Sequence, residues 1–276
     1  MGPGLRRDGG TTCLRDVLGV LASWRFIIFL FAVALTTPAL ARPLEQVKES
    51  GALALCAHPN ALPFSAKDGA LHGFQVETAR ALAQAVGVAL ETHWTVAAHD
   101  LNRADCDFVL DAIADPEAQA ESRLTLSKPY GSSGVALAVR ADNDMIHGFG
   151  DLAGAGKIGI LPGSMAAMIL GQHGVHTSPA GFESDLLDEV AAGDLAGAAV
   201  TPTAIGYYNS RHAAHPMKAV ATFADQRDLN WNLAVGIVNP DAALIAAIDA
   251  ALDKLVAAGT IKAIYARYGV DLAPPR

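Results

Sequence analysis

The chain has 276 residues, 51% of them hydrophobic, and a formal net charge of −8. Residues 1–41 carry four Arg and two Asp, so the remainder of the chain carries −10. This acidic balance, without any basic run, argues against nucleic acid or anionic membranes as partners. The length fits one large or two smaller domains.

Residues 1–41 have the pattern of a secretory signal peptide. Arginines precede an apolar run at residues 26–35, and Ala39-Leu40-Ala41 follows as a cleavage site. The apolar run is shorter than the about 20 residues that a membrane-spanning helix needs. We therefore predict a mature chain of residues 42–276 in the periplasm. An uncleaved N-terminal anchor is the alternative.

Short apolar strands alternate with helices along the mature chain. The apolar runs predict strands at residues 53–57, 88–94, 106–113, 135–139, 157–161, 195–200 and 233–238. Helical spacing and end signals predict helices between Gly73 and Gly87, from Ser164 through Leu170, from Ser184 or Asp185 to Gly193, from Pro240 and from Thr260. A strand, a helix and a parallel strand form a right-handed unit, and this unit occurs twice.

This order predicts an α/β protein of two lobes that are joined by two crossings of the chain. Residues 42–134 form the first part of lobe 1, residues 135–232 form lobe 2, and residues 233–276 return to lobe 1. Two crossings make a hinge about which lobes close. Because such sheets bind ligands at the carboxyl ends of their strands, a ligand cleft is expected between the lobes.

Two cysteines, Cys56 and Cys106, follow the predicted cleavage site. An oxidising compartment would permit a disulfide between them. However, Cys56 lies late in one predicted strand and Cys106 at the start of a parallel neighbour, an offset that places them about 10 Å apart. A disulfide needs Cα atoms within about 7 Å, so this register argues against a bridge unless it is shifted.

Four motifs in this order resemble the type II periplasmic solute-binding proteins of family 3. Residues 73–74 are similar to the family's Gly-Phe entry to its first helix, and residues 126–130 to its Phe-Ser-x-Pro-Tyr turn. Residues 151–164 are similar to the entry of the second lobe, and residues 257–269 to the closing helices. The resemblance implies a two-lobed, non-catalytic binding protein.

Amino-acid binders of that family hold the charges of their ligand at three positions. An acidic residue after the first strand binds the ammonium group, and an Asp often follows a second-lobe strand; these positions fall here on His58 and Thr201. An Arg forks the carboxylate. That position falls here on Gln119 or Ala120, and Arg123 is displaced from it by about three residues. A zwitterionic amino acid would therefore be poorly held, because buried charges need partners.

One branch of the family resembles the chain more closely. Residues 56–65, Cys106-Asp107 and residues 200–207 are similar to stretches of the MxaJ/XoxJ-type accessory proteins of quinoprotein methanol and alcohol dehydrogenases, although Ala196 and Thr201 replace an Asp and a Trp of that group. This resemblance implies an accessory whose partner is a PQQ-dependent dehydrogenase or its cytochrome. The alternative is a receptor that delivers a small polar solute, other than a standard amino acid, to an ABC permease.

Ten side chains are candidate ligand contacts, because they follow strand ends, begin a helix or lie at the two crossings. They are His58, Phe64, Asp111, Arg123, Tyr130, Ser133, Ser164, Met165, Thr201 and Trp231. Each has an ordinary structural alternative. A loop histidine bonds to the backbone, a serine caps its helix, and an aromatic ring fills the core or the hinge.

No metal, other cofactor or catalytic activity is expected. Two histidine pairs, at residues 173–176 and 212–215, have no obvious third ligand. The chain carries neither a G-x-S-x-G elbow nor a phosphate-binding loop. A dehydratase on this fold would need a carboxylate beside a cation, an arrangement that Asp111 and Arg123 could imitate. We predict a non-catalytic protein instead.

Overall fold

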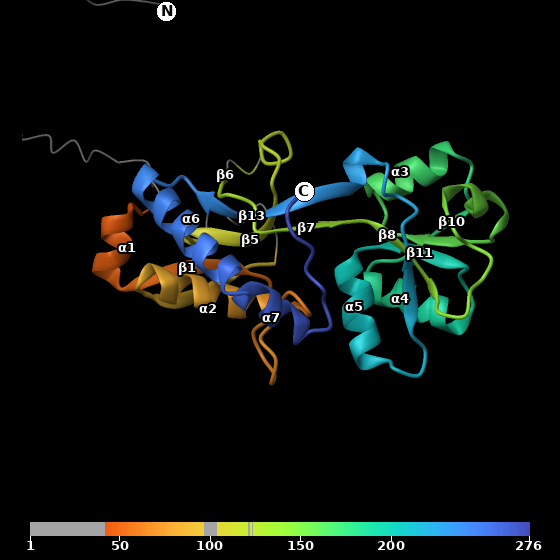
Figure 1. Ribbon diagram of the computed structural model, residues 1–276, viewed down its shortest axis with the longest axis horizontal. Helices are drawn as coiled ribbons and strands as arrows, with labels where there is room; N and C mark the ends of the chain where they lie inside the picture. The colour runs from red at the N-terminus through yellow and green to blue at the C-terminus, as the bar shows by residue number, and fades with distance from the viewer. Residues whose placement is uncertain (1–41, 97–103, 121, 123) are drawn as a thin grey trace, which may run out of the picture. The chain divides into compact units, whose positions relative to one another are not determined.

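The computed structural model describes residues 42–96, 104–120, 122 and 124–276. The predicted signal peptide and Arg123 lie outside these residues. The described chain contains two large β-sheets, each with its own helices, as the predicted α/β architecture requires (Figure 1).

The first sheet combines strands from distant parts of the chain. Its order is β4 (Ala89–Trp94), β1 (Ala52–Ala57), β5 (Phe108–Ile113), β13 (Asn230–Val238) and β6 (Leu124–Leu126), and β7 (Gly131–Gly134) also pairs with β13. Strand β1 is parallel to β4 and β5, whereas β13 is antiparallel to β5, β6 and β7. The return of the chain through β13 therefore completes a sheet that the first hundred residues begin.

Within the described part of the chain, four helices accompany this sheet. They are α1 (Leu44–Ser50), α2 (Phe74–Val86), α6 (Ala242–Ala257) and α7 (Thr260–Ala266). Figure 1 shows α2 and α6 beside each other, and α2 also contacts β1 and β5. Their apolar faces share one core with the sheet, in which Phe74 stacks on Tyr265 with ring centroids 4.1 Å apart. A short hairpin of β2 (Asn60–Ala61) and β3 (Ser65–Ala66) lies between β1 and α2.

The second sheet is buried on both faces. Its order is β10 (Thr177–Pro179), β9 (Ile158–Ile160), β11 (Gly197–Val200), β8 (Ala136–Arg140) and β12 (Met217–Val220), with α3 (Met165–Gln172), α4 (Glu183–Ala192) and α5 (Pro202–Arg211) around it. Leu137 and Val139 of β8 belong to one core cluster, and Ala136 and Ala138 to another. The alternation follows from the two-residue period of a strand and explains the uninterrupted apolar sequence.

Two short segments connect the sheets. Val135 alone separates β7 from β8, and the 3-10 helix η3 (Arg227–Leu229) precedes β13 on the return; a second 3-10 helix, η2 (Phe149–Gly154), follows β8. Helix α5 also approaches the turn that follows α7 so closely that Gly206 and Gly269 both need to be glycine. A Cβ atom on Gly206 would lie 2.3 Å from the carbonyl oxygen of Gly269, which itself has a φ of +76°.

Most predicted strands and helices are confirmed, but three helix starts differ. Helix α4 begins at Glu183, before the expected caps. Helix α6 is capped by Asp241, which accepts a hydrogen bond of 2.8 Å from the backbone N–H of Leu244, so Pro240 precedes the helix. Thr260 is the first residue of α7 and not its cap. Helix α5 was not predicted, because Pro and Gly interrupt its short apolar pattern.

The prediction about the cysteines was wrong, because Cys56 and Cys106 form a disulfide with Cα atoms 5.5 Å apart. Leu55 pairs with Phe108, so the three-residue offset between the strands is present. Cys106, however, precedes β5 and does not lie in it. A turn that includes Asp105, with a φ of +51°, brings Cys106 back beside Cys56. The error was to assume an extended chain at Cys106.

We expect the double variant Cys56→Ala/Cys106→Ala to lower the free energy of unfolding by about 2–4 kcal/mol, because the bridge restricts a 50-residue loop of the unfolded chain. Urea titration measures this. Wild-type protein in a strong reductant should show the same loss. If the variant is as stable as wild type in the absence of reductant, and mass spectrometry finds both Cys56 and Cys106 as free thiols in that wild type, the bridge does not exist in solution.

Candidate functional site

Asp111, one of the expected ligand contacts, has its carboxyl buried in a hydrogen-bond network within the protein. Its Oδ1 accepts from the hydroxyls of Tyr130 at 2.6 Å and Tyr265 at 2.5 Å, and its Oδ2 accepts from Nε2 of Gln75 at 2.7 Å. Its backbone N–H donates to the Tyr130 hydroxyl at 2.9 Å. The network joins β5, α2, α7 and the segment before β7. Asp111 and Tyr130 thus engage each other.

Burial dominates the electrostatics of this network. It raises the pKa of Asp111 above its ordinary value, although the hydrogen bonds from Tyr130, Tyr265 and Gln75 oppose that rise. Burial and the neighbouring carboxyl together hold the pKa values of both tyrosines well above the usual range. The hydrogen bonds hold the three side chains together, and their polar atoms are buried and already have partners.

A second expected position, Thr201, is also engaged within the protein. Glu183 of α4 accepts from the Thr201 backbone N–H at 2.6 Å and from its hydroxyl at 3.0 Å. The hydroxyl also caps α5 by accepting from the N–H of Ala204. Burial raises the pKa of Glu183, and its two hydrogen bonds from Thr201 oppose the rise. The pair fixes the start of α4 against the start of α5.

Ser164, Met165 and Trp231 have identifiable surroundings. The hydroxyl of Ser164 caps α3 by accepting from the N–H of Ala167 at 3.2 Å, while Met165 is 44% exposed. Trp231 is opposite Ser133 in the pairing of β13 with β7 and packs against the core of the first sheet. Neither Ser164, Met165 nor Trp231 lines the two pockets described below.

His58 and Phe64 meet in a pocket of about 410 Å³, which we call the loop pocket. One wall is the segment after β1, and the facing walls are Leu161, the start of α4 and the second half of α5. The lining residues are His58, Asn60, Ala61, Leu62, Pro63, Phe64, Leu161, Gly181, Phe182, Glu183, Ser184, Leu187, Ala204, Tyr207, Tyr208, Arg211 and His212. Most of the lining side chains are apolar or aromatic.

The geometry of the segment after β1 sets the chemistry of this wall. The Nδ1 atom of His58 accepts a hydrogen bond of 3.0 Å from the backbone N–H of Asn60. A neutral imidazole with an accepting Nδ1 carries its proton on Nε2, so His58 presents an N–H donor there. Phe64 is half-buried, and its ring centroid lies 5.1 Å from that of Phe74 in the core below. This wall therefore presents the Nε2–H donor of His58 beside the ring of Phe64, which packs on Phe74.

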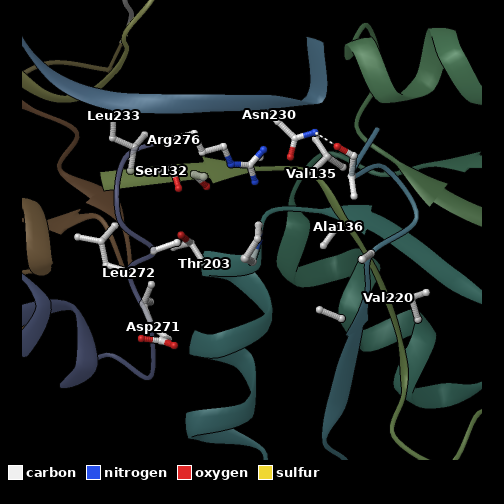
Figure 2. A pocket seen from close by; sticks show the side chains of 18 residues that line it. Ser132, Val135, Ala136, Thr203, Val220, Asn230, Leu233, Asp271, Leu272 and Arg276 are labelled. Atoms are coloured by element: carbon white, nitrogen blue, oxygen red, sulfur yellow. Dashed lines mark hydrogen bonds between the residues drawn. The ribbon is translucent and has the colours of Figure 1, made fainter. Parts of the chain in front are cut away.

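A second pocket, of about 430 Å³, lies beside β7 and contains Ser133. Figure 2 shows Ser132 of β7, Thr203 of α5 and Leu272 of the C-terminal segment around it. The C-terminal segment is held to this place, because the Ser132 hydroxyl donates to the carbonyl oxygen of Pro274 at 2.7 Å and Arg276 N donates to Oδ1 of Asn232 at 2.8 Å. The described lining of this second pocket combines small side chains with Leu233, Leu272 and the charged Asp271 and Arg276, and it includes no aromatic ring.

Sequence reasoning missed the half of the loop pocket that α4 and α5 provide. Three of these lining residues, Tyr207, Tyr208 and Arg211, lie on α5, which was not predicted. Phe182 directly precedes α4, whose start was misplaced. A usable signal was present, since Thr201-Pro202 combines a capping residue with a proline at the first helical position.

No group of three or more His, Cys, Asp or Glu side chains in the described ranges is arranged to hold a metal ion. None of the helices within those ranges has the length and apolar character needed to cross a membrane.

Comparison with known proteins identifies the architecture. Residues 53–271 match the profile of the bacterial extracellular solute-binding proteins, family 3. No curated protein matches the chain in sequence. Among solved structures, an ancestral cationic amino acid solute-binding protein, AncCDT-1, aligns with a TM-score of 0.70 at 22% identity, over 82% of this chain and 99% of its own.

Two natural proteins give a similar result. The L-cystine solute receptor of Neisseria gonorrhoeae, in its unliganded open conformation, has a TM-score of 0.68 at 22% identity, over 83% of this chain and 98% of its own. MxaJ from Methlophaga aminisulfidivorans MPT has a TM-score of 0.65 at 24% identity, over 80% and 99%. These likenesses show the fold, which is the two-lobed type II periplasmic binding protein fold with two crossings.

The Asp111 network predicts a stability difference between two variants. Asp111→Ala leaves the Tyr130 and Tyr265 hydroxyls and the Gln75 amide without their acceptor and places Ala at a φ of +56°. We expect the free energy of unfolding to fall by about 2–5 kcal/mol. Asp111→Asn keeps an oxygen for the tyrosines and should cost less. Urea titration of both variants measures the difference.

The same network predicts a pH dependence. Because the pKa of Asp111 is raised on folding, its contribution to stability is present below about pH 4, the ordinary range of an Asp, and is lost as the pH rises through the folded pKa. Asp111→Asn should remove this component. An unchanged slope of stability against pH in Asp111→Asn would show that Asp111 does not titrate as described.

Proposed function

The chain belongs to the bacterial extracellular solute-binding proteins of family 3, and on that premise we propose that it is a non-catalytic periplasmic accessory of a PQQ-dependent methanol or alcohol dehydrogenase. In this role the protein docks to the dehydrogenase or to its cytochrome and assists maturation or electron transfer. It requires no cofactor of its own.

The observation that carries the proposal is the internal use of the expected ligand positions. Thr201 bonds to Glu183, and Asp111 bonds to two tyrosines. His58 replaces an acidic residue and presents a donor, where an ammonium group needs an acceptor. A zwitterionic amino acid would find no free carboxylate at these places, so capture of such ligands is not the function that the geometry supports.

The disulfide supports the same reading. Cys56 and Cys106 belong to the two sequence stretches on which the resemblance to the accessory proteins rests, and the bridge joins these stretches. The buried carboxylate of Asp107 adds to the junction by accepting from the N–H of Ala54 at 2.7 Å and from the guanidinium of Arg42. MxaJ shares the fold, which makes the accessory role available to this architecture.

A second function, delivery of a small organic solute to an ABC permease, is favoured by one observation. The loop pocket, at about 410 Å³, is within the range of small-molecule sites. Its apolar walls point to a less polar solute than the sequence suggested.

A binding experiment separates the two functions. The purified mature protein is immobilised and exposed to the native host's periplasmic extract from alcohol-grown cells, and retained proteins are identified by mass spectrometry. We expect a PQQ dehydrogenase or its cytochrome to be retained, and the purified dehydrogenase to bind directly in biolayer interferometry.

The control is an amino-acid binder of family 3 immobilised at the same density, since it shares the fold but not the motif at residues 56–65. Equal retention by both proteins, or no direct binding of the purified dehydrogenase, contradicts the accessory role.

A further inference from the structure

We propose that the loop pocket binds a small aromatic monocarboxylate, whose ring lies against Phe64 and Tyr207 and whose carboxylate is held by Arg211, with His58 as a further donor. This inference names a ligand class for this one member of the solute-binding family, and it does not depend on the dehydrogenase partner.

The walls suit an aromatic ring. Phe64, Phe182 and Tyr207 face the pocket with Leu62 and Leu161. Phe64 is held in place by Phe74, so its orientation exists before a ligand arrives. Phe182 is 71% exposed and Leu62 is 39% exposed. A ligand that covers them removes apolar surface from water at roughly 25 cal/mol per Å². Preformed aromatic surface of this kind favours a flat apolar ligand.

Arg211 is a free cation at this pocket. It is exposed at the last residue of α5, and its guanidinium forms no hydrogen bond or ion pair with any residue that the structure describes. A guanidinium binds a carboxylate through two parallel hydrogen bonds. The neighbouring His212 stacks on Tyr208 with ring centroids 4.1 Å apart and bonds to its backbone oxygen, which fixes the end of the helix.

The Nε2–H of His58 is a second donor. Its Nδ1 is occupied by Asn60, and Nε2 has no hydrogen-bond partner among the described residues. The carbonyl oxygen of His58 accepts from the Ser65 hydroxyl at 2.8 Å, which fixes the backbone on which the imidazole stands. The pocket thus offers donors to a ligand from both of its walls, through His58 and Arg211.

Glu183 is the one carboxylate among the described residues that line the pocket, and each of its oxygens already accepts a hydrogen bond. Both carboxylate oxygens accept from Thr201. Burial also raises the pKa of Glu183, although the two hydrogen bonds from Thr201 oppose the rise. An ammonium group would therefore have to share the only carboxylate among the described lining residues with Thr201. The arrangement favours an acid without an amino group over an amino acid of the same size.

Isothermal titration calorimetry with phenylacetate tests the proposal, with benzyl alcohol, benzylamine and L-phenylalanine as matched probes. We expect phenylacetate to bind at least about tenfold more tightly than each of the other three, because only it combines the ring with an unaccompanied carboxylate. Benzyl alcohol tests the charge, benzylamine its sign, and L-phenylalanine the penalty for an ammonium group.

Variants locate the site. Arg211→Gln should weaken phenylacetate binding at least about tenfold, Arg211→Lys should weaken it less, and Phe64→Ala should weaken phenylacetate and benzyl alcohol alike. Arg227→Gln is the control, because Arg227 is exposed on η3 and lies outside the pocket. Unchanged melting temperatures of Arg211→Gln and Arg227→Gln separate lost binding from lost folding.

Three results would overturn the assignment. They are no binding of phenylacetate to folded wild type at millimolar concentration, equal affinity for benzyl alcohol, and equal loss in Arg211→Gln and Arg227→Gln. Dehydrogenase binding is measured separately in the absence of any acid. Its failure would leave the ligand assignment standing, and failure of phenylacetate would leave the accessory role standing.

Discussion

The committed carboxyl of Asp111 is the constraint on which the rest of the site depends. Asp111 has a φ of +56° within β5, where the register with β13 shifts, and its carboxyl accepts hydrogen bonds from Tyr130, Tyr265 and Gln75. Removing a buried carboxyl from these donors would leave hydroxyls unsatisfied, which costs more than the bonds gain. The first sheet, α2 and α7 are therefore held together by the group that would otherwise be available to a ligand.

Because Asp111 is bonded inside the protein, the polar groups that remain free for a ligand lie near α5. Glu183 and Thr201 fix the starts of α4 and α5 against each other, and the close contact of Gly206 with Gly269 ties the middle of α5 to the end of α7. The far end of α5 then presents Tyr207 and Arg211 to the segment after β1. The same fold that holds charged amino acids in other family members therefore carries, in this protein, a pocket with mainly apolar and aromatic walls. Function depends on the side chains that line a site and not on the fold.

Sequence predicts the parts of this protein that are set locally. The apolar runs of β8 and β11, the glycine stop of α2 and the Ser164 cap depend on neighbours a few residues away. The Asp111 network does not, because Gln75 and Tyr265 reach it from 36 and 154 residues away. The turn that returns Cys106 to Cys56 was missed for a related reason, since a single φ of +51° at Asp105 decides it.

Both walls of the loop pocket are fixed by bonds at or beside His58 and Thr201, two of the expected ligand positions. On one side the disulfide fixes the end of β1, and Ser65 fixes the backbone of His58. On the other side Thr201 and Glu183 fix α4 and α5. A preorganised pocket loses little conformational entropy when it is filled, so even one ion pair and one aromatic contact can give useful affinity. In the proposed site, Thr201 and Glu183 thus hold the starts of α4 and α5 in place, whereas His58 and Arg211 contact the ligand.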